Sequence, residues 1–215
     1  MTLNELSASL RDCRQCRLAS GRTQVVFGTG NPHATIMFVG EAPGYYEDKQ
    51  GEPFVGAAGK LLNELLASIG LSRSDIYIAN VIKCRPPNNR DPQPDEVETC
   101  KPFLLNQIQL IQPHLVCTLG NFATQTLLNK KVGITKVRGR AIPLSEFVVF
   151  PLLHPAAALH QGNLKSVLVE DFQKLKEVLD SLKHKPSDSS TTDSVSGTPD
   201  RSEVEPVQPI QMNLF

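Results

Sequence analysis

Four short apolar runs, separated by helical patterns, constrain the fold of this 215-residue chain more than any other feature. The runs are ATIMFVG (34–40), IYIANVI (76–82), HLVCTLG (114–120) and FVVFPLL (147–153). They are apolar almost throughout, which is typical of strands covered on both faces. Apolar residues recur at helical spacing in residues 2–12, 57–69, 94–111, 121–129 and 164–182. This alternation predicts a three-layer α/β/α fold with a four-stranded parallel sheet.

The composition divides the chain into three parts. Residues 1–185 carry 17 acidic and 21 basic side chains and are predicted to form one folded domain. Residues 186–209 are polar and rich in Ser and Thr, so we expect a disordered linker, and 210–215 (IQMNLF) are apolar again. We see neither an apolar run of membrane-spanning length nor a signal peptide. We therefore expect a cytoplasmic monomer with no membrane partner.

Polar residues follow the ends of the four runs, where ligands bind in open α/β sheets. These residues are Glu41, Asn80, Asn121 and His154. Each alone has a structural explanation: a loop acid, a turn former, a helix cap and a core histidine. We expect Asn121 to be a helix cap. Because the other three converge on one edge, they predict a binding site.

Two glycine-rich loops border the same edge. GEAPG (40–44) is a turn whose backbone N–H groups can hold an anion, and no GK[ST] follows it as in a phosphate-binding P-loop. Phe54 lies in GEPFVG (51–56), where it either plugs the core or offers a stacking surface to a flat ring.

The five cysteines raise a separate question. Cys13 and Cys16 form C-x2-C, and Cys84 and Cys100 form C-x15-C, whereas Cys117 lies in an apolar run and is expected to be a core thiol. An odd count in a reducing compartment argues against a disulfide framework. Four buried thiols, a zinc site and an iron–sulfur cluster all remain compatible with the spacing.

The motifs GEAPGYYED, GEPFVGAAGKLL, YIANVIKCRPPNNRDP, RGRAIPL and HPAAALH, with the four cysteines, resemble the family 4 uracil-DNA glycosylases. The resemblance covers about residues 1–180. It implies an enzyme that flips uracil out of single- or double-stranded DNA and hydrolyses its N-glycosidic bond, which starts base excision repair. It also implies that one structural 4Fe–4S cluster is held by Cys13, Cys16, Cys84 and Cys100.

The same resemblance implies a uracil pocket. Its residues would be Gly40, Glu41, Ala42, Glu47, Phe54, Asn80 and His154. Phe54 would stack on uracil, Asn80 would read its O4 and N3–H, and His154 would donate to O2. Family 1 enzymes carry an aspartate where this chain has Ala42, so Glu41 is expected to position the water. Glu47 would exclude the methyl group of thymine.

Basic residues near this edge are expected to contact DNA phosphates. They are Lys83, Arg85, Arg90, Arg138 and Arg140. For each residue singly, a solvated basic rim explains the charge equally well.

The last five residues, QMNLF, resemble the bacterial sliding-clamp-binding pentapeptide. Gln211, Met212, Leu214 and Phe215 would bind the clamp, and this feature points to a bacterial type of the family. Two other functions stay open: a catalytically silent nucleic-acid-binding protein that kept the cluster, and a zinc-stapled hydrolase of unrelated substrate.

Overall fold

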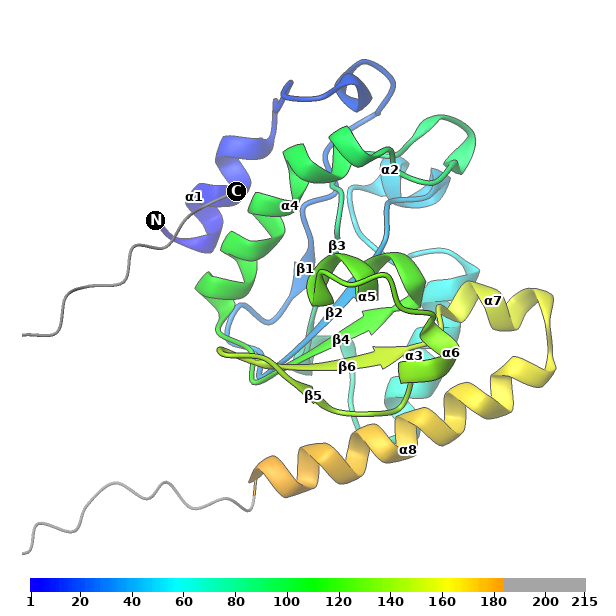
Figure 1. Ribbon diagram of the computed structural model, residues 1–215. Helices are drawn as coiled ribbons and strands as arrows, with labels where there is room; N and C mark the ends of the chain where they lie inside the picture. The colour runs from blue at the N-terminus through cyan, green and yellow to red at the C-terminus, as the bar shows by residue number, and fades with distance from the viewer. Residues whose placement is uncertain (184–215) are drawn as a thin grey trace, which may run out of the picture. The chain divides into compact units, whose positions relative to one another are not determined.

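The computed structural model describes residues 1–183, and the predicted linker and clamp-binding tail lie outside them. Four parallel strands form the centre of its sheet (Figure 1). They are β2 (Ile36–Gly40), β3 (Tyr77–Asn80), β4 (Leu115–Leu119) and β6 (Val148–Leu152). Each lies inside one of the apolar runs, so the prediction of four parallel strands is confirmed.

The sheet as a whole is mixed and has six strands, which corrects the prediction of a four-stranded parallel sheet. β1 (Thr29–Gly30) pairs antiparallel with β3, and β5 (Ile142–Pro143) pairs antiparallel with β6. The strand order is β1-β3-β2-β4-β6-β5. Two residues are too few to show the alternation that marks a strand, which is why the sequence did not reveal the two edge strands.

Helices cover both faces of the sheet (Figure 1). α3 (Ala57–Ser68) and α8 (Asn163–Lys183) share one core with Phe38 of β2. The helices α1 (Leu3–Leu10), α4 (Pro94–Ile111) and α5 (Gly120–Leu128) form a second core on the other face of the sheet, with Met37 and Val39 of β2. Neighbouring residues of β2 thus enter opposite cores, as the period of a strand requires. This double covering explains why the central strands read as continuous apolar runs.

Three short helices were not predicted. They are α2 (Tyr45–Gln50), α6 (Ile134–Val137) and α7 (Pro155–His160). Short 3-10 helices also lie at Arg17–Ser20, Arg73–Asp75 and Pro87–Asn89. α2 follows the GEAPG loop, and α7 begins directly after His154. Both therefore start at the carboxyl edge of the sheet.

The strand order creates a crevice at this edge. β2 lies between β3 and β4, so the chain leaves β2 toward one side of the sheet and later returns to the other side. Such a reversal separates the connecting segments at the carboxyl ends and leaves room for a ligand. Within residues 1–183, we find no helix that is long and apolar enough to cross a membrane.

Candidate active site

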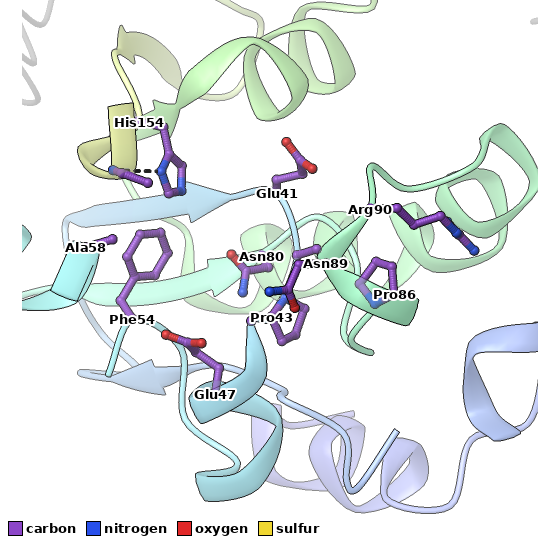
Figure 2. A pocket seen from close by; sticks show the side chains of 13 residues that line it. Glu41, Pro43, Glu47, Phe54, Ala58, Asn80, Pro86, Asn89, Arg90 and His154 are labelled. Atoms are coloured by element: carbon purple, nitrogen blue, oxygen red, sulfur yellow. Dashed lines mark hydrogen bonds between the residues drawn. The ribbon is translucent and has the colours of Figure 1, made fainter. Parts of the chain in front are cut away.

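A pocket of about 370 Å³ opens at the carboxyl ends of β2, β3 and β6 (Figure 2). Its lining includes six residues predicted from the sequence: Glu41, Ala42, Glu47, Phe54, Asn80 and His154. Gly40, the seventh, lies against the same side chains, because a Cβ added there would come within 2.7 Å of Phe54 Cζ. The structure therefore brings the predicted pocket residues together from four separate segments of the chain.

Phe54 is held in an unusual backbone conformation. Its φ is 57°, in the left-handed region that a bulky side chain rarely adopts. Arg73 donates from Nη1 to the Phe54 carbonyl (2.8 Å) and from Nη2 to the Pro53 carbonyl (2.6 Å). A Cβ on Gly59 would collide with the same Phe54 carbonyl. Phe54 is thus a pocket wall whose orientation is fixed from outside the pocket.

Glu47 holds the other end of this loop. Its Oε1 accepts hydrogen bonds from the backbone N–H groups of Val55 and Gly56, both at 3.2 Å. The carboxylate therefore has a defined place in the pocket lining, and it faces the Phe54 side of the cavity in Figure 2.

His154 stands beside Phe54. The two rings are stacked, with centroids 5.6 Å apart and planes 30° apart. His154 is the N-cap of α7, and its Nδ1 accepts a hydrogen bond from the Ala156 backbone N–H at 3.1 Å. Burial lowers the pKa of His154 to about 4, against a smaller opposite effect of Glu47. The imidazole is therefore neutral near pH 7, and because Nδ1 accepts, its proton lies on Nε2.

Asn80 closes the floor of the pocket. It is 2% exposed, at the end of β3. Among residues 1–183 no group hydrogen-bonds its side-chain amide, whereas its backbone carbonyl accepts from Lys83 Nζ at 2.7 Å. A buried amide that keeps both donor and acceptor free is suited to reading a polar ligand edge.

Glu41 lies between two hollows. It lines the main pocket and also a neighbouring hollow of about 450 Å³ that includes Asp91 and His154. Burial, and secondarily the negative charge of Asp91, raise the pKa of Glu41 above its usual 4.5. The Glu41 carbonyl accepts from the Ile82 N–H, which ties the GEAPG loop to the segment after β3. Glu41 is thus a proton acceptor placed at the boundary between the two hollows.

Sequence reasoning missed several residues of the pocket wall. The segment after β3 contributes Pro86 and Asn89, together with Arg90, which the sequence predicted only as a phosphate contact. Asn88 and Asn89 both have positive φ, 53° and 54°. The signal was present in the RPPNNR motif, because Pro-Pro-Asn-Asn is typical of a turn and Asn tolerates the left-handed region. Arg90 points away from the pocket in Figure 2 and pairs with the buried Glu96, at 2.6 Å.

The phosphate contact expected of Lys83 is wrong. Lys83 is 2% exposed, and its Nζ donates to the Asn80 carbonyl and to Gln107 Oε1 (2.5 Å). Burial lowers the pKa of Lys83 to about 8, and the nearby cysteines oppose this shift. A side chain enclosed in this way cannot reach a DNA phosphate. It supports the pocket floor instead.

The other three of the four arginines predicted to contact phosphates, beside Arg90, have different environments. Arg85 Nε donates to Asn89 Oδ1 at 2.7 Å, beside the pocket. Arg138 pairs with the buried Asp171 at 2.7 Å, and Arg140 is exposed. Among the described residues, Arg138 and Arg140 do not belong to the lining of the main pocket.

Asn121 does not cap its own helix, which corrects the expectation. The N-cap of α5 is Leu119, and Asn121 lies in the first turn. Its Oδ1 accepts from the Ile134 N–H at 2.7 Å. It therefore caps the start of α6 instead.

Four cysteines line one small cavity on the α4 face of the sheet. They are Cys13, Cys16, Cys84 and Cys100, together with apolar neighbours such as Leu10 and Phe103. The Lys83 backbone N–H donates to Cys100 Sγ (3.3 Å), and Arg22 Nη1 donates to Cys84 Sγ (3.5 Å). Cys117 is fully buried in β4, as expected for a core thiol.

This donor set is chemically suited to a metal centre. Four sulfurs favour soft metals such as zinc or the irons of an iron–sulfur cluster. Among the described residues, no group of three or more His, Cys, Asp or Glu side chains is arranged to hold a single metal ion. The cavity thus brings four thiols together without fixing a coordination geometry.

Comparisons with known proteins agree with this site. The family described as "Uracil DNA glycosylase superfamily" matches residues 27–183. The chain is 48% identical over 186 residues to the type-4 uracil-DNA glycosylase of Sulfurisphaera tokodaii, covering 82% of this chain and 84% of the relative. It is 47% identical over 178 residues to the type-4 enzyme of Thermotoga maritima, covering 81% and 93%. A type-5 uracil-DNA glycosylase of Pyrobaculum aerophilum is 30% identical over 145 residues, covering 59% and 63%. With a pocket built from the predicted residues and a family match over most of its length, the chain belongs to the uracil-DNA glycosylase superfamily.

Proposed function

We propose that this protein flips uracil out of DNA and hydrolyses its N-glycosidic bond, leaving an abasic site and free uracil. One observation carries the proposal: Phe54, Asn80 and the neutral His154 meet in one pocket. They offer a stacking surface, an amide with free donors and acceptor, and an Nε2–H donor. A flipped base is recognised by stacking and by hydrogen bonds to its polar edge, and these three groups match uracil.

Asn80 supplies the base specificity. Its amide NH2 donates to uracil O4, and its amide oxygen accepts from N3–H. Cytosine presents an amino group at C4 and an unprotonated N3, so the same amide would face a donor with its donor and an acceptor with its acceptor. A buried amide left unpaired in this way strongly disfavours the wrong base.

His154 stabilises the leaving group. Negative charge develops on the uracil ring as the glycosidic bond breaks, and O2 carries part of it. The Nε2–H of a neutral imidazole donates to O2 at that stage, when its hydrogen bond is strongest. The bond from Ala156 N–H to Nδ1 fixes both the ring and the tautomer.

Glu41 positions the water. With uracil in the main pocket, the deoxyribose lies toward the neighbouring hollow, and Glu41 lies at the boundary between the two. Its carboxylate accepts a proton from water that attacks C1′. Burial, which raises the pKa of Glu41, makes it a better proton acceptor than an exposed carboxylate.

Glu47 excludes thymine. Its carboxylate is fixed by Val55 and Gly56 and lines the pocket. We place it against C5 of uracil, where the methyl group of thymine would collide with it.

Cys13, Cys16, Cys84 and Cys100 hold a 4Fe–4S cluster in this proposal. The four sulfurs around one cavity and the two N–H donors directed at sulfur support it. The cluster would join the N-terminal segment to the loop after β3 and to α4, and its role is structural.

Arg85, Arg138 and Arg140 contact DNA phosphates. Arg85 lies beside the pocket, Arg138 pairs with Asp171, and Arg140 is exposed. Removing one phosphate contact should lower the slope of log K against log salt by about 1. We expect this for Arg140→Ala, measured by titration over a range of salt concentrations.

The C-terminal tail tethers the enzyme to the bacterial sliding clamp through Gln211, Met212, Leu214 and Phe215. This proposal rests on the resemblance of QMNLF (211–215) to the clamp-binding pentapeptide, because the tail lies outside the described residues. A tether of this kind raises the local concentration of the enzyme on newly made DNA. Deleting residues 211–215 should abolish clamp binding measured by surface plasmon resonance. Unchanged clamp binding would exclude the tether.

The function is tested with an oligonucleotide that carries one uracil, followed by alkaline cleavage of abasic sites. We expect strand cleavage at uracil and none at cytosine or thymine in the same position. His154→Ala should lower the single-turnover rate about 100- to 1000-fold, the range for loss of one oxyanion donor. The exposed His160 in α7 provides the control, since His160→Ala should cleave at the wild-type rate.

A further inference from the structure

Two adjacent tyrosines lie at the pocket rim with much of their surface exposed. Tyr45 and Tyr46 open α2 and are 49% and 61% exposed. Their rings meet edge to face, with centroids 5.4 Å apart. A single exposed aromatic side chain needs no explanation, but two adjacent ones beside a pocket form a contiguous aromatic surface that a ligand can use.

Positive charge surrounds Tyr45. The Arg85 guanidinium lies over its ring at 5.0 Å, and Lys49 Nζ lies 5.9 Å from the same ring. Arg85 is held in place independently, because its Nε donates to Asn89 Oδ1 at 2.7 Å. The surface therefore combines aromatic faces with cations, which is the combination that binds the bases and phosphates of single-stranded nucleic acid.

This surface is continuous with the pocket. Gly44 and Glu47, which flank the two tyrosines, both line the pocket, and so does Asn89, which holds Arg85. In Figure 1, α2 lies beside the turn that leads into α4, as the contact between Arg85 and Tyr45 requires. A DNA strand with one nucleotide in the pocket would therefore bring its neighbouring nucleotide to Tyr45 and Tyr46.

We propose that Tyr45, Tyr46 and Arg85 form a stacking platform for the unpaired base next to the flipped uracil in single-stranded DNA. The proposal rests on the proposed function for the position of uracil. An unpaired base presents a free aromatic face, whereas a base inside a duplex is already stacked on both sides. Arg85 contributes through its cation and lies within reach of the adjoining phosphate.

The test measures coupling between the platform and the neighbouring base. Single-stranded oligonucleotides carry one 2′-fluorinated deoxyuridine, which resists hydrolysis. In a second set, the nucleotides on either side are replaced, one at a time, by a baseless spacer. Fluorescence anisotropy gives Kd for the wild type, for the double variant Tyr45→Ala/Tyr46→Ala and for Tyr45→Phe/Tyr46→Phe. Leu105→Ala, at an exposed apolar position of α4, is the control.

We expect the double alanine variant to bind about 5- to 100-fold more weakly, the range for loss of base stacking. The phenylalanine variant keeps the ring faces and should bind like the wild type, as should Leu105→Ala. With a baseless neighbour on the platform side, the alanine and wild-type proteins should bind equally, because the stacking partner is gone. The platform would be overturned if the double alanine variant lost the same affinity on both sets of DNA, or lost no affinity on either set.

Excision from an ordinary uracil oligonucleotide, measured on the same protein, separates the two proposals. If uracil is excised but the affinity loss of the alanine variant does not depend on the neighbouring base (no coupling), the platform is overturned and the glycosylase function stands. Coupling without excision would support the platform and overturn the glycosylase function. The absence of both would overturn both.

Discussion

Phe54 shows how much of the pocket depends on single residues that lie outside it. A bulky residue in the left-handed region costs about 1–3 kcal/mol, so other contacts must hold it there. Arg73 binds two successive carbonyls, and Gly59 leaves space for the turn. The family resemblance predicted Phe54 as a pocket residue, but the sequence did not reveal Arg73. The reason is that Arg73 lies 19 positions after Phe54 and 20 after Pro53, and no local sequence pattern indicates hydrogen bonds over that separation.

Arg73→Ala should therefore impair catalysis without touching the substrate. We expect kcat/KM for uracil excision to fall about 10- to 100-fold, the scale of a small displacement of a positioning group. Arg73→Lys, which can reach one carbonyl, should recover part of this loss. A thermal melt provides the control, because a purely structural role would lower Tm and leave kcat/KM of the folded protein unchanged.

Glu41 determines the acidic limb of the pH–rate profile in our account. Burial and Asp91 raise the pKa of Glu41 above 4.5, so the single-turnover rate should fall as the pH drops through that raised value. His154, with a pKa lowered to about 4, stays neutral over the range from about pH 5 to 8 and adds no second limb there. Glu41→Gln should be slow and lack the limb. An unchanged limb in that variant would assign it to another group.

The same shift has a consequence for stability. Because the pKa of Glu41 is raised, the folded protein binds this proton more tightly than the unfolded chain does. The stabilisation that protonated Glu41 contributes is therefore present below pH 4.5 and is lost as the pH rises through the raised pKa. Glu41→Gln removes this loss, and its Tm at neutral pH should equal or exceed that of the wild type. A lower Tm would show that the carboxylate is needed for folding rather than for the reaction.

At the scale of elements, length separates what could be predicted from what could not. The five longer helices and the four central strands repeat their apolar pattern several times, and all were predicted close to their bounds. α2, α6 and α7 span four to six residues, which is too short for a helical apolar pattern to repeat. Asn121 was misassigned in consequence, because it caps α6 from within α5. Lys83 was misplaced for a similar reason, since its burial depends on Gln107 of α4.

The cysteine-bearing segments give a prediction at this scale. Cys100 in α4 and Cys84 after β3 line one cavity with the N-terminal pair, whereas Cys117 is buried in β4. Cys100→Ser should lose iron and sulfide, together with the brown absorption, and should lower Tm. Cys117→Ala should keep the full iron content at a cost of about 1 kcal/mol for the lost buried sulfur. Iron and sulfide analysis of both variants checks this, and zinc in place of iron in the wild type would overturn the cluster.

At the scale of the whole folded domain, the pocket depends on the order of the strands. Glu41, Asn80 and His154 are far apart in the sequence, but each follows the end of a parallel strand, so the topology alone brings them to one edge. That is why the pocket could be predicted from the sequence. Its outer rim was predicted only in part: Arg85 was placed near this edge, but its contacts with Tyr45 and Asn89 are made by turns and short helices rather than by the sheet.

The central claim is that this pocket releases uracil from DNA. The most direct measurement is chromatographic quantification of free uracil released from a uracil-containing oligonucleotide by the purified wild-type protein and by Asn80→Ala. The account predicts one uracil released per uracil site by the wild type and a loss of at least about 100-fold in rate for Asn80→Ala. Intact uracil DNA after incubation with the wild type, or equal release by the variant, would contradict it.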